Sequence, residues 1–483
     1  ISERPLLLKC LNDYIVQWPL GDRPLPRKKN AMNHYPKILI IVSLLFTSTL
    51  AEDRPNILLI LADDLGFEDL GFQNSPEIQS PNLDRLAANG IRFTDGHTTA
   101  SVCSPSRAGL MTGRYQQRFG HEANVPPTPH GMDLDEVTLG QRMQQAGYRT
   151  GIIGKWHLGN LDTQYPTARG FDYFYGLREG SRSYFYNAKK DDKPGNHHGI
   201  EENGKQVSFE GYLTDVLGDK AIDFIDEPSQ KPFFLYLSFT APHGPMHGKE
   251  EDIARFAHIE NPKRRTYASM VWAMDRAIGN VIDKLEAQGI ADNTLIWFLS
   301  DNGGASGNAS SNLPLAGFKG IKFEGGIRVP FIMHWKDRFP EGRVFKPMVS
   351  ALDILPTCVA AAGGDPKSER PLDGVNLLPF LDTPRSSVPH ETLFWHKLWF
   401  SAMRSGPWKL IYVQDYGYAL YNLEDDLSER KDFSKSMPER VEKMAKSMNL
   451  WKSELIEPQW SEGIQWFDAH SKNHIRIING ALR

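Results

Sequence analysis

Cysteine is scarce in this chain. Only Cys10, Cys103 and Cys358 occur among its 483 residues, whereas small secreted domains that rely on disulfides contain a much higher density of cysteine. The composition therefore excludes a disulfide-stapled scaffold. Cys358 lies in an apolar stretch of helical character, where a cysteine is typically buried and inert. The chain is long enough for one large domain and a smaller one.

An excess of one charge and long apolar runs are also missing. The formal net charge is −4, so the basic surface expected of a nucleic-acid-binding protein is lacking. The apolar run at residues 38–51 has about 14 residues, fewer than the ~20 that a helix needs to span a bilayer. We therefore expect neither a nucleic-acid partner nor a stable membrane span.

That run instead has the features of a secretory signal peptide. It follows a short polar stretch and ends with the small residues Thr49 and Ala51, which predicts a signal peptide at residues 32–51 with cleavage before Glu52. The alternative is a membrane anchor, which the short run disfavours. The protein is thus expected to be exported to a periplasm, a cell surface or the medium. Residues 1–31 precede this start and are interpreted as a non-native or disordered leader.

Apolar runs alternate with helical patterns through most of the chain. The run at residues 56–62 has no polar alternation, which is typical of a strand buried on both faces. Residues 264–288 carry apolar side chains along one helical face and end at Gly289, a common helix stop. This alternation predicts an α/β domain over residues 52–392, built on a mainly parallel sheet flanked by helices.

The pattern changes after residue 392. Residues 403–413 and 418–423 are predicted to be the two strands of a hairpin, and residues 438–455 an amphipathic helix. Residues 393–457 are therefore predicted to form a smaller α+β domain with an antiparallel sheet. The tail at residues 458–483 has no assignment from the pattern.

Polar residues stand where four of the apolar runs end. They are Asp63-Asp64, Lys155-Trp156-His157, Pro242-His243 and Asp301-Asn302-Gly303-Gly304. In open parallel sheets, ligands bind beyond the carboxyl ends of the strands, so these groups are expected to meet at one site. Adjacent strand residues point to opposite faces, so Asp63 and Asp64 can share a ligand only if the strand breaks there, which Gly66 would permit.

The acidic groups at these strand ends suggest a metal site. Asp63, Asp64, Asp301 and Asn302 offer only oxygen ligands, which Ca²⁺ and Mg²⁺ prefer and zinc does not. Asp-Asp-Leu-Gly and Asp-Asn-Gly-Gly also have the composition of tight turns. From these residues alone, a turn is favoured over a metal site for either pair.

Two longer motifs add to these groups. Residues 101–114 (SVCSPSRAGLMTGR) place Cys103 in a C-x-P-x-R pattern that continues to a Thr-Gly-Arg turn, and residues 147–157 are GYRTGIIGKWH. With these motifs the chain resembles the type I, formylglycine-dependent sulfatases, of the arylsulfatase and N-acetylgalactosamine-sulfatase kind, over roughly residues 54–455. A bare C-x-P-x-R could also be a structural cysteine in a loop. The resemblance implies an alkaline-phosphatase-like α/β domain, a smaller C-terminal sheet domain and the activity of a sulfuric ester hydrolase.

The resemblance also implies a role for each site residue. Cys103 would be oxidised to formylglycine (3-oxoalanine) by a formylglycine-generating enzyme, and the hydrated aldehyde would be the nucleophile. The implied catalytic residues are Cys103, Arg107, Lys155, His157, His243 and Lys319, and the implied metal ligands are Asp63, Asp64, Cys103, Asp301 and Asn302. The implied ion is Ca²⁺, with Mg²⁺ as the alternative. Lys322 lies three residues after Lys319, but the spacing to Glu324-Gly-Gly favours Lys319.

The resemblance implies a two-step reaction. One hydroxyl of the hydrated aldehyde, deprotonated with help from Asp301, attacks sulfur, while His243 and Lys319 stabilise or protonate the departing alcohol. His157 then takes the proton of the second hydroxyl, sulfate leaves and the aldehyde is restored. A serine at position 103 has no second hydroxyl, so Cys103→Ser is expected to stop after one turnover.

The sequence defines the substrate less well. The segments expected to shape the pocket are residues 117–129 and 178–205, with His121, Asn124 and Tyr184 as candidate substrate-binding residues. Aromatic and basic side chains in an exported protein suit a sulfated sugar, so a carbohydrate sulfatase is favoured over an enzyme for simple aryl sulfates. A phosphate or phosphonate ester hydrolase and an inactive glycan-binding protein are the alternatives.

Overall fold

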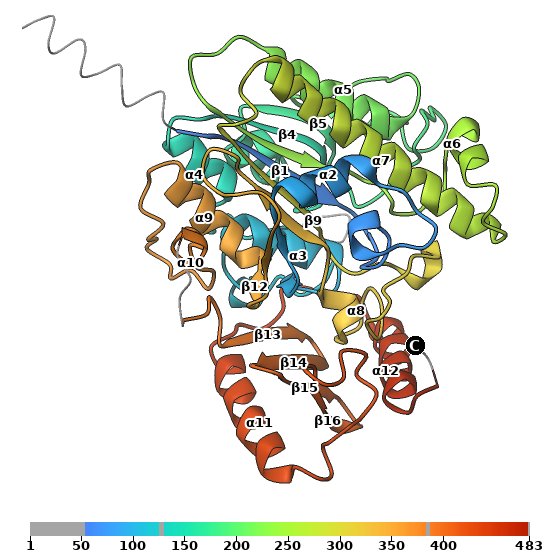
Figure 1. Cartoon of the computed structure of the whole chain (residues 1–483), viewed down its shortest axis with the longest axis vertical. Coiled ribbons are helices and arrows are strands. Elements are labelled where there is room, and N and C mark those ends of the chain that lie inside the picture. Colours follow the sequence, from blue (N-terminus) through green and yellow to red (C-terminus); the bar gives the residue numbers. More distant parts are fainter. Residues whose placement is uncertain (1–53, 125–129, 383–386, 482–483) are drawn as a thin grey trace, which may run out of the picture. The chain divides into compact units, whose positions relative to one another are not determined.

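The computed structural model describes residues 54–124, 130–382 and 387–481, which are drawn in colour in Figure 1. The predicted leader and signal peptide, residues 1–51, lie outside these ranges, and so do residues 125–129 of the predicted pocket segment. Among the described helices, none has both the length and the hydropathy needed to cross a bilayer.

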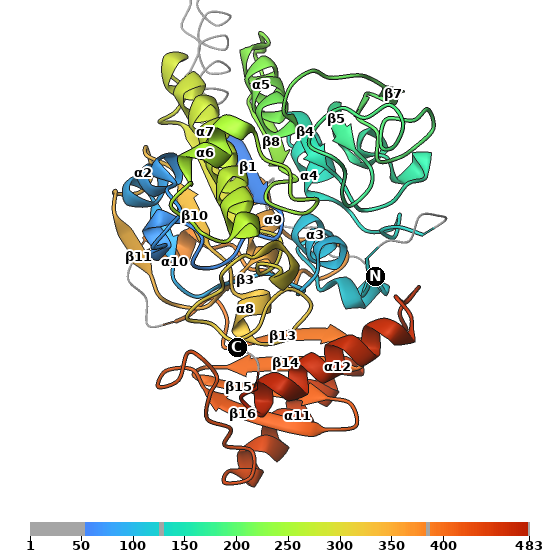
Figure 2. The same cartoon turned by 90° about the vertical axis from the view of Figure 1, so that its right-hand side faces the viewer.

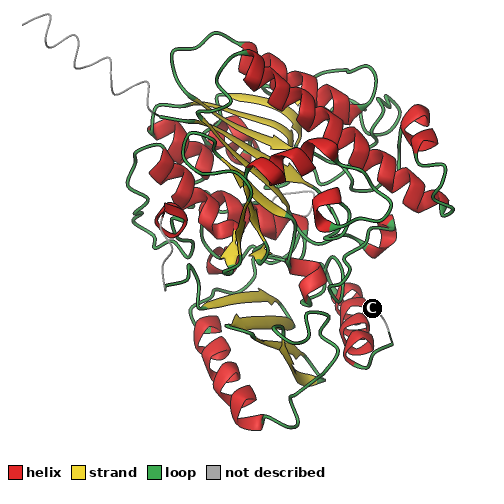
Figure 3. Cartoon of the chain, in the orientation of Figure 1, coloured by secondary structure: helices red, strands yellow, loops and turns green. Residues whose placement is uncertain are grey.

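A ten-stranded sheet is the largest element of the described chain (Figures 1 and 3). Its strands are β1 (Asn56–Ala62), β2 (Ile91–Phe93), β4 (Arg149–Lys155), β5 (Tyr173–Leu177), β6 (Glu201–Glu202), β7 (Lys205–Gln206), β8 (Phe233–Ser238), β9 (Thr294–Ser300), β10 (Phe331–His334) and β11 (Arg343–Phe345). The strand order is β11-β2-β10-β9-β1-β8-β4-β5-β6-β7. The strands from β9 to β5 in this order are parallel, and β10 is antiparallel to both neighbours. The prediction of a mainly parallel sheet is confirmed.

Helices cover both faces of this sheet. One face carries α2 (Pro81–Asn89), α5 (Leu213–Asp226) and α7 (Pro262–Ala287), with α6 (Glu250–Arg255) packed on α7, and the other carries α3 (Cys103–Thr112), α4 (Leu139–Gln145), α9 (Ile354–Ala361) and α10 (Leu378–Asp382). Alternate residues of β1 enter the two cores, Leu58 and Ile60 the first and Leu59 and Leu61 the second. Because both faces are covered, β1 is apolar throughout.

The long helix α7 begins two residues before the predicted start. The side chain of Asn261 accepts hydrogen bonds from the N–H groups of Lys263 and Arg264, and Pro262 occupies the first helical position. The helix ends before Gly289, whose φ is +69°. Two further short strands, β3 (Gly96–His97) and β12 (Val349–Ser350), pair in parallel, and α8 spans Glu324–Ile327.

A separate four-stranded antiparallel sheet follows the large one, as predicted. Its strands are β13 (Thr392–Lys397), β14 (Phe400–Ser405), β15 (Trp408–Val413) and β16 (Gly417–Asn422), paired in chain order. Residues 403–413 are not one strand, because a turn at Gly406 (φ +54°) divides them between β14 and β15.

Each face of the small sheet is covered by a helix. Met403 and Leu420 pack against Met444 and Met448 of α11 (Pro438–Lys452). The other face packs against Ile477 of α12 (Ile464–Ile478), and α12 lies in front of the sheet in Figure 2. The tail without a sequence assignment therefore contains a helix, which contributes a face of this core.

Candidate active site

Cys103 is the first residue of α3, and its thiol is buried. Its Sγ lies 3.4 Å from Asp63 Oδ1 and 3.1 Å from Lys319 Nζ. Burial alone would raise the pKa of the thiol, but the ammonium groups of Lys155 and Lys319 outweigh burial and lower this pKa to about 7. The unmodified side chain therefore has substantial thiolate character at neutral pH.

Asp63 and Asp64 follow β1 directly and are both buried. The backbone of Asp64 is left-handed (φ +66°), so the strand breaks at Asp64 itself and not at Gly66. Asp64 N donates to Asp301 Oδ1 at 3.3 Å, and Asn302 Nδ2 donates to Asp64 Oδ1 at 2.8 Å. The break thus brings the two acidic segments, at the ends of neighbouring strands β1 and β9, into direct contact.

Glycines allow a third segment to reach these acids. A Cβ on Gly303 would lie only 1.8 Å from the carbonyl oxygen of Gly325, and Gly303 N donates to Gly326 O at 3.1 Å. Such an approach leaves no space for a side chain at Gly303. The loop after β9 and the Glu324-Gly-Gly segment therefore lie against each other, which brings the loop of Lys319 to the acidic cluster.

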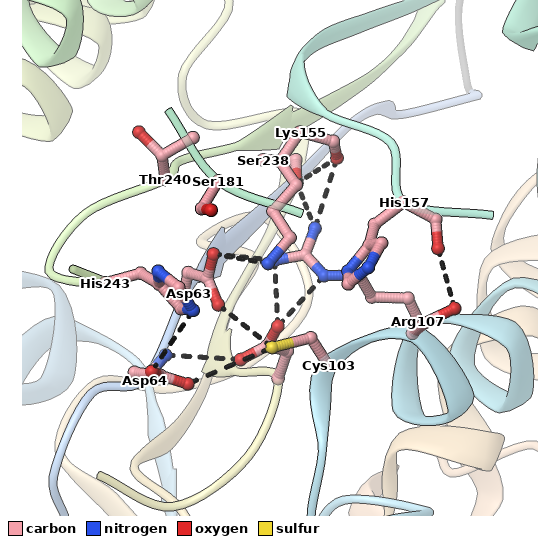
Figure 4. Close-up of polar contacts among 12 residues, drawn as sticks. Asp63, Asp64, Cys103, Arg107, Lys155, His157, Ser181, Ser238, Thr240 and His243 are labelled. Atoms are coloured by element: carbon pink, nitrogen blue, oxygen red, sulfur yellow. Dashed lines mark hydrogen bonds and ion pairs between the residues drawn. The ribbon is translucent and has the colours of Figure 1, made fainter. Parts of the chain in front are cut away.

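Lys155 and Arg107 approach the cluster from β4 and α3 (Figure 4). Lys155 Nζ lies 2.6 Å from Asp63 Oδ2, and Arg107 Nε donates to Asp301 Oδ2 at 2.9 Å. Arg107 also donates to Ser238 Oγ at 2.6 Å and to the carbonyl oxygen of Lys155 at 3.1 Å. Sequence analysis did not select Ser238, although it is the last residue of β8 and strand-end reasoning could have found it.

Lys319, and not Lys322, reaches the cluster. Lys319 Nζ lies 2.6 Å from Asp64 Oδ1, whereas Lys322 Nζ donates to Ser101 Oγ at 3.1 Å. His243 lies on the same side, with its Nε2 3.5 Å from Asp64 Oδ2 (Figure 4). The side chains of Lys319 and His243 are 16% and 23% exposed, so the cluster opens to solvent beside them.

The buried carboxylates differ in their pKa values. Burial raises the pKa of Asp63, and burial together with the charge of Asp63 raises the pKa of Asp301 to about 6. At Asp64 the ammonium group of Lys319 outweighs burial and lowers the pKa below its usual value. Burial therefore disfavours the charged forms of two of the three carboxylates even beside Lys155 and Arg107, as expected of a site that takes a cation.

The donor set fits a hard divalent cation. Asn302 Oδ1 is buried without a hydrogen-bond partner, although Nδ2 of the same amide is bonded. Ligand atoms of Asp63, Asp64, Cys103 and His243 all lie within 4.8 Å of one another. A buried amide oxygen beside three carboxylates is the kind of ligand set that Ca²⁺ or Mg²⁺ prefers. The residues proposed as ligands from the sequence are therefore brought together.

His157 follows β4, two residues after Lys155. Its backbone is left-handed (φ +57°), and its carbonyl oxygen accepts a hydrogen bond from Ser104 Oγ at 2.7 Å. Burial, and the positive charges of Lys155 and Arg107, hold the pKa of the ring well below its usual value. Nδ1 is buried without a hydrogen-bond partner. The ring is therefore a neutral imidazole that retains one unused position.

The three candidate substrate-binding residues form hydrogen bonds with Ser104, Thr240 and His243. His121 and Tyr184 are each only 1% exposed. His121 Nε2 lies 2.7 Å from Ser104 Oγ, and Asn124 Oδ1 accepts the N–H of Ser104 at 3.2 Å. The Tyr184 hydroxyl donates to the carbonyl oxygens of Thr240 and His243. These contacts favour support of the site over direct contact with a substrate.

Asn308 also belongs to the cluster. Its Nδ2 donates to Asp64 Oδ2 at 3.4 Å. It lies six residues after Asn302 in a short 3₁₀ turn, Ser306–Asn308. Nothing in the local pattern separates it from the other polar residues of this loop, so sequence reasoning could not have selected it.

Comparison with known proteins gives consistent results. The family model described as "Sulfatase" matches residues 55–364. Arylsulfatase G of Rattus norvegicus is 32% identical over 462 residues, covering 81% of this chain and 85% of that protein. N-acetylgalactosamine-6-sulfatase of Homo sapiens is 35% identical over 354 residues, covering 68% and 66%. Arylsulfatase J of Mus musculus is 35% identical, but the chain spans only 59% of its length.

Solved structures with the same fold extend this picture. Ps i-CgsB, solved in complex with k-i-k-neocarrahexaose, has a TM-score of 0.81 and 36% sequence identity, covering 88% of this chain and 99% of that one. The phosphonate monoester hydrolase of Agrobacterium radiobacter has a TM-score of 0.62 at 21% identity, covering 83% and 96%, and so shares the fold alone.

Proposed function

The chain belongs to the sulfatase family, and we propose from this premise that it hydrolyses sulfate monoesters of carbohydrates. The observation that carries the proposal is the position of Cys103, at the buried start of α3 between two lysines and three carboxylates. Cys103 is the proposed precursor of formylglycine, which requires a formylglycine-generating enzyme during maturation. The names of the relatives and the oligosaccharide in the Ps i-CgsB structure support a sugar sulfate.

The charges of the cluster suit an anionic substrate. Asp63, Asp64 and Asp301 are matched in number by Arg107, Lys155 and Lys319. With a bound divalent cation, the pocket would carry about two positive charges in excess, which favours a sulfate ester and the charge that shifts in its transition state. Removing one of these positive groups should cost roughly 3–4 kcal/mol of transition-state stabilisation, as for an oxyanion-hole donor.

Asp63, Asp64, Asp301, Asn302 and the side chain at position 103 are the proposed ligands of a Ca²⁺ ion. When bound, such an ion supplies Lewis acidity and acidifies an oxygen nucleophile. In the resembled family, the aldehyde at position 103 supplies that oxygen once it is hydrated. Sulfate binding and proton transfer are carried out by side chains of the protein itself.

These side chains bind the sulfate group and move protons. Lys155 and Arg107, held against Asp63 and Asp301, fix the buried side of the site and offer positive charge to sulfate oxygens. His243 and Lys319, which are partly exposed, lie where a departing alcohol can accept a proton. Neutral His157 has a free Nδ1 with which to accept a proton from the side chain at position 103, so that sulfate can leave.

The proposal is tested by sulfate release from protein co-expressed with a formylglycine-generating enzyme. We expect turnover of sulfated galactosaminide and carrageenan oligosaccharides, slower turnover of 4-nitrophenyl sulfate and much slower turnover of 4-nitrophenyl phosphate. Mass spectrometry of the peptide that contains residue 103 should show an aldehyde in place of the thiol. Activity of protein that keeps a free thiol there, or a preference for the phosphate ester, would refute the proposal.

A further inference from the structure

The C-terminal helix α12 contacts the loop that carries Lys319. His470 Nδ1 donates to the carbonyl oxygen of Gly320 at 3.0 Å, and His474 Nε2 accepts the N–H of Lys322 at 3.0 Å. These two backbone groups lie on either side of the turn that follows Lys319. Two histidines one helical turn apart thus hold the loop from one side.

The contact between α12 and this loop is close. Gly320 has a left-handed backbone (φ +88°), and a Cβ there would lie 2.0 Å from Cε1 of His470. His474 Nδ1 donates to the carbonyl oxygen of His470 at 2.7 Å, and its ring stacks on Phe400 with 4.7 Å between ring centres. Both rings of the histidine pair therefore have defined hydrogen-bonding roles and little freedom to move.

The segment before α12 forms hydrogen bonds with Asn124, near the start of α3. Trp460 Nε1 donates to the carbonyl oxygen of Asn124 at 2.8 Å, and Glu462 Oε1 accepts the N–H of Asn124 at 2.9 Å. Asn124 in turn accepts the N–H of Ser104, the residue after Cys103. The tail therefore contacts two loops next to Cys103, one that carries Lys319 and one that carries Asn124.

We propose that residues 459–478 complete the active site, and that His470 and His474 are positioning residues for Lys319. This inference rests on the proposed function, in which Lys319 assists the leaving group. Without the two hydrogen bonds, the loop of Lys319 relaxes away from Asp64. The ammonium group of Lys319 then no longer stabilises the departing alcohol. The loss falls on substrates whose leaving group needs that help.

The histidines can be tested with paired variants. His470→Leu removes the hydrogen-bond donor to Gly320, whereas His470→Asn keeps a donor at the same distance from the backbone. His474→Leu removes the acceptor for Lys322, and His474→Gln keeps one. Lys472→Leu, at an exposed position of the same helix, is the matched control. Amide hydrogen exchange of peptides covering residues 316–327 should become faster in the two Leu variants only.

Kinetics then separate positioning from a general loss of structure. For sugar and alkyl sulfates, His470→Leu should lower kcat/KM about 10- to 100-fold, the range expected for a misplaced catalytic group. For 4-nitrophenyl sulfate, a good leaving group that needs little assistance, the loss should be about twofold or less. His470→Asn should restore the rate, and His470→Leu should add little to Lys319→Ala, because the two changes remove one function.

Each outcome decides a separate point. Equal losses for all leaving groups, or a full additional loss in the Lys319→Ala background, would overturn the positioning role. Unchanged hydrogen exchange in the Leu variants would overturn it as well, even if the wild-type protein hydrolysed no sulfate ester. Inactivity of mature wild-type protein would count against the proposed function alone.

Discussion

The chain buries two clusters of ionisable side chains that match in composition and differ in use. The active-site cluster holds Asp63, Asp64, Asp301, Arg107, Lys155 and Lys319. The second cluster, between the large domain and the small sheet, holds Asp95, Glu324, Glu429, Arg328, Arg404 and Lys409, together with His97. Each therefore combines three carboxylates with three strong bases.

The second cluster is closed by its own ion pairs. Lys409 Nζ lies 2.8 Å from both Glu324 Oε1 and Glu429 Oε1, and Arg404 Nη2 lies 3.1 Å from Asp95 Oδ2. Lys409 and His97 outweigh burial and hold the pKa of Glu324 well below its usual value. Asp95, His97 and Glu324 lie close enough together to bind a metal ion, but basic side chains already fill that position.

The active-site cluster is incomplete by comparison. Asn302 Oδ1 has no hydrogen-bond partner, the pKa values of Asp63 and Asp301 are raised, and Lys319 and His243 are partly open to solvent. Close approach of acids is therefore weak evidence for a metal site. An amide oxygen with neither a hydrogen bond nor an ion pair, and access to solvent beside Lys319 and His243, distinguish the reactive cluster. In the structural cluster the pKa of Glu429 is also raised, but its Oε1 lies 2.8 Å from Lys409 Nζ.

The largest expected effect concerns the nucleophile position. The steady-state rate of sulfate release by Cys103→Ser should be lower than that of wild type by roughly a thousandfold or more, the scale seen when an enzyme loses its nucleophile. Serine has no second hydroxyl proton for His157 to remove. Sulfate release is followed past one equivalent per protein. Cys358→Ala is the control, since Cys358 is buried away from both clusters. Sustained turnover by Cys103→Ser would contradict the mechanism.

The second cluster should govern stability and not chemistry. Lys409→Met leaves Glu324 and Glu429 buried without their shared cation, so the free energy of unfolding should fall by about 3–5 kcal/mol. Denaturant unfolding measures this, with exposed Lys446→Met as the control. The kcat of folded Lys409→Met should stay near that of wild type. A loss of kcat without a loss of stability would contradict the structural role of the second cluster.

Metal binding should separate the two clusters directly. After chelation, added Ca²⁺ should restore activity and raise the melting temperature, because a ligand that binds only the native state stabilises it. Asn302→Ala should weaken the Ca²⁺ dependence of both readouts about 10- to 100-fold in concentration. Asp95→Asn in the second cluster should leave the Ca²⁺ dependence unchanged. Full activity after exhaustive chelation would rule out the proposed ion.

The second cluster should also show a pH dependence of stability. Burial raises the pKa of Glu429 to about 7, against the opposing charge of Lys409. The native state therefore holds a proton that the unfolded chain has released, and the stability due to this group is lost as pH rises from about 4.5 to 7. Relative to Glu429→Gln, the wild type should lose about 3 kcal/mol across this window. No loss of relative stability across this window would show that Glu429 is already ionised in the native state.

Much of the fold could be predicted from local pattern. The apolar run of β1 predicts a strand and the periodicity of α7 predicts a helix, and neither prediction depends on tertiary contacts. The predicted strand 403–413 was wrong because two strands of similar composition adjoin through a turn at Gly406, which a local pattern does not resolve. The helix α12 was not assigned, since its packing partners come from the small sheet and residues 316–327.

The sequence by itself determined the kinds of chemistry at this site. Carboxylates, a lysine and histidines stand at the ends of apolar runs, and ligands bind beyond such strand ends. The separate C-x-P-x-R motif adds a cysteine. The spacing to Glu324-Gly-Gly already favoured Lys319 over Lys322. Only the tertiary structure decided that Asn308 reaches Asp64, and that His470 and His474 support the loop of Lys319. The reason is physical. Local periodicity sets which face of an element is buried, whereas contacts across a hundred or more residues depend on how whole elements pack.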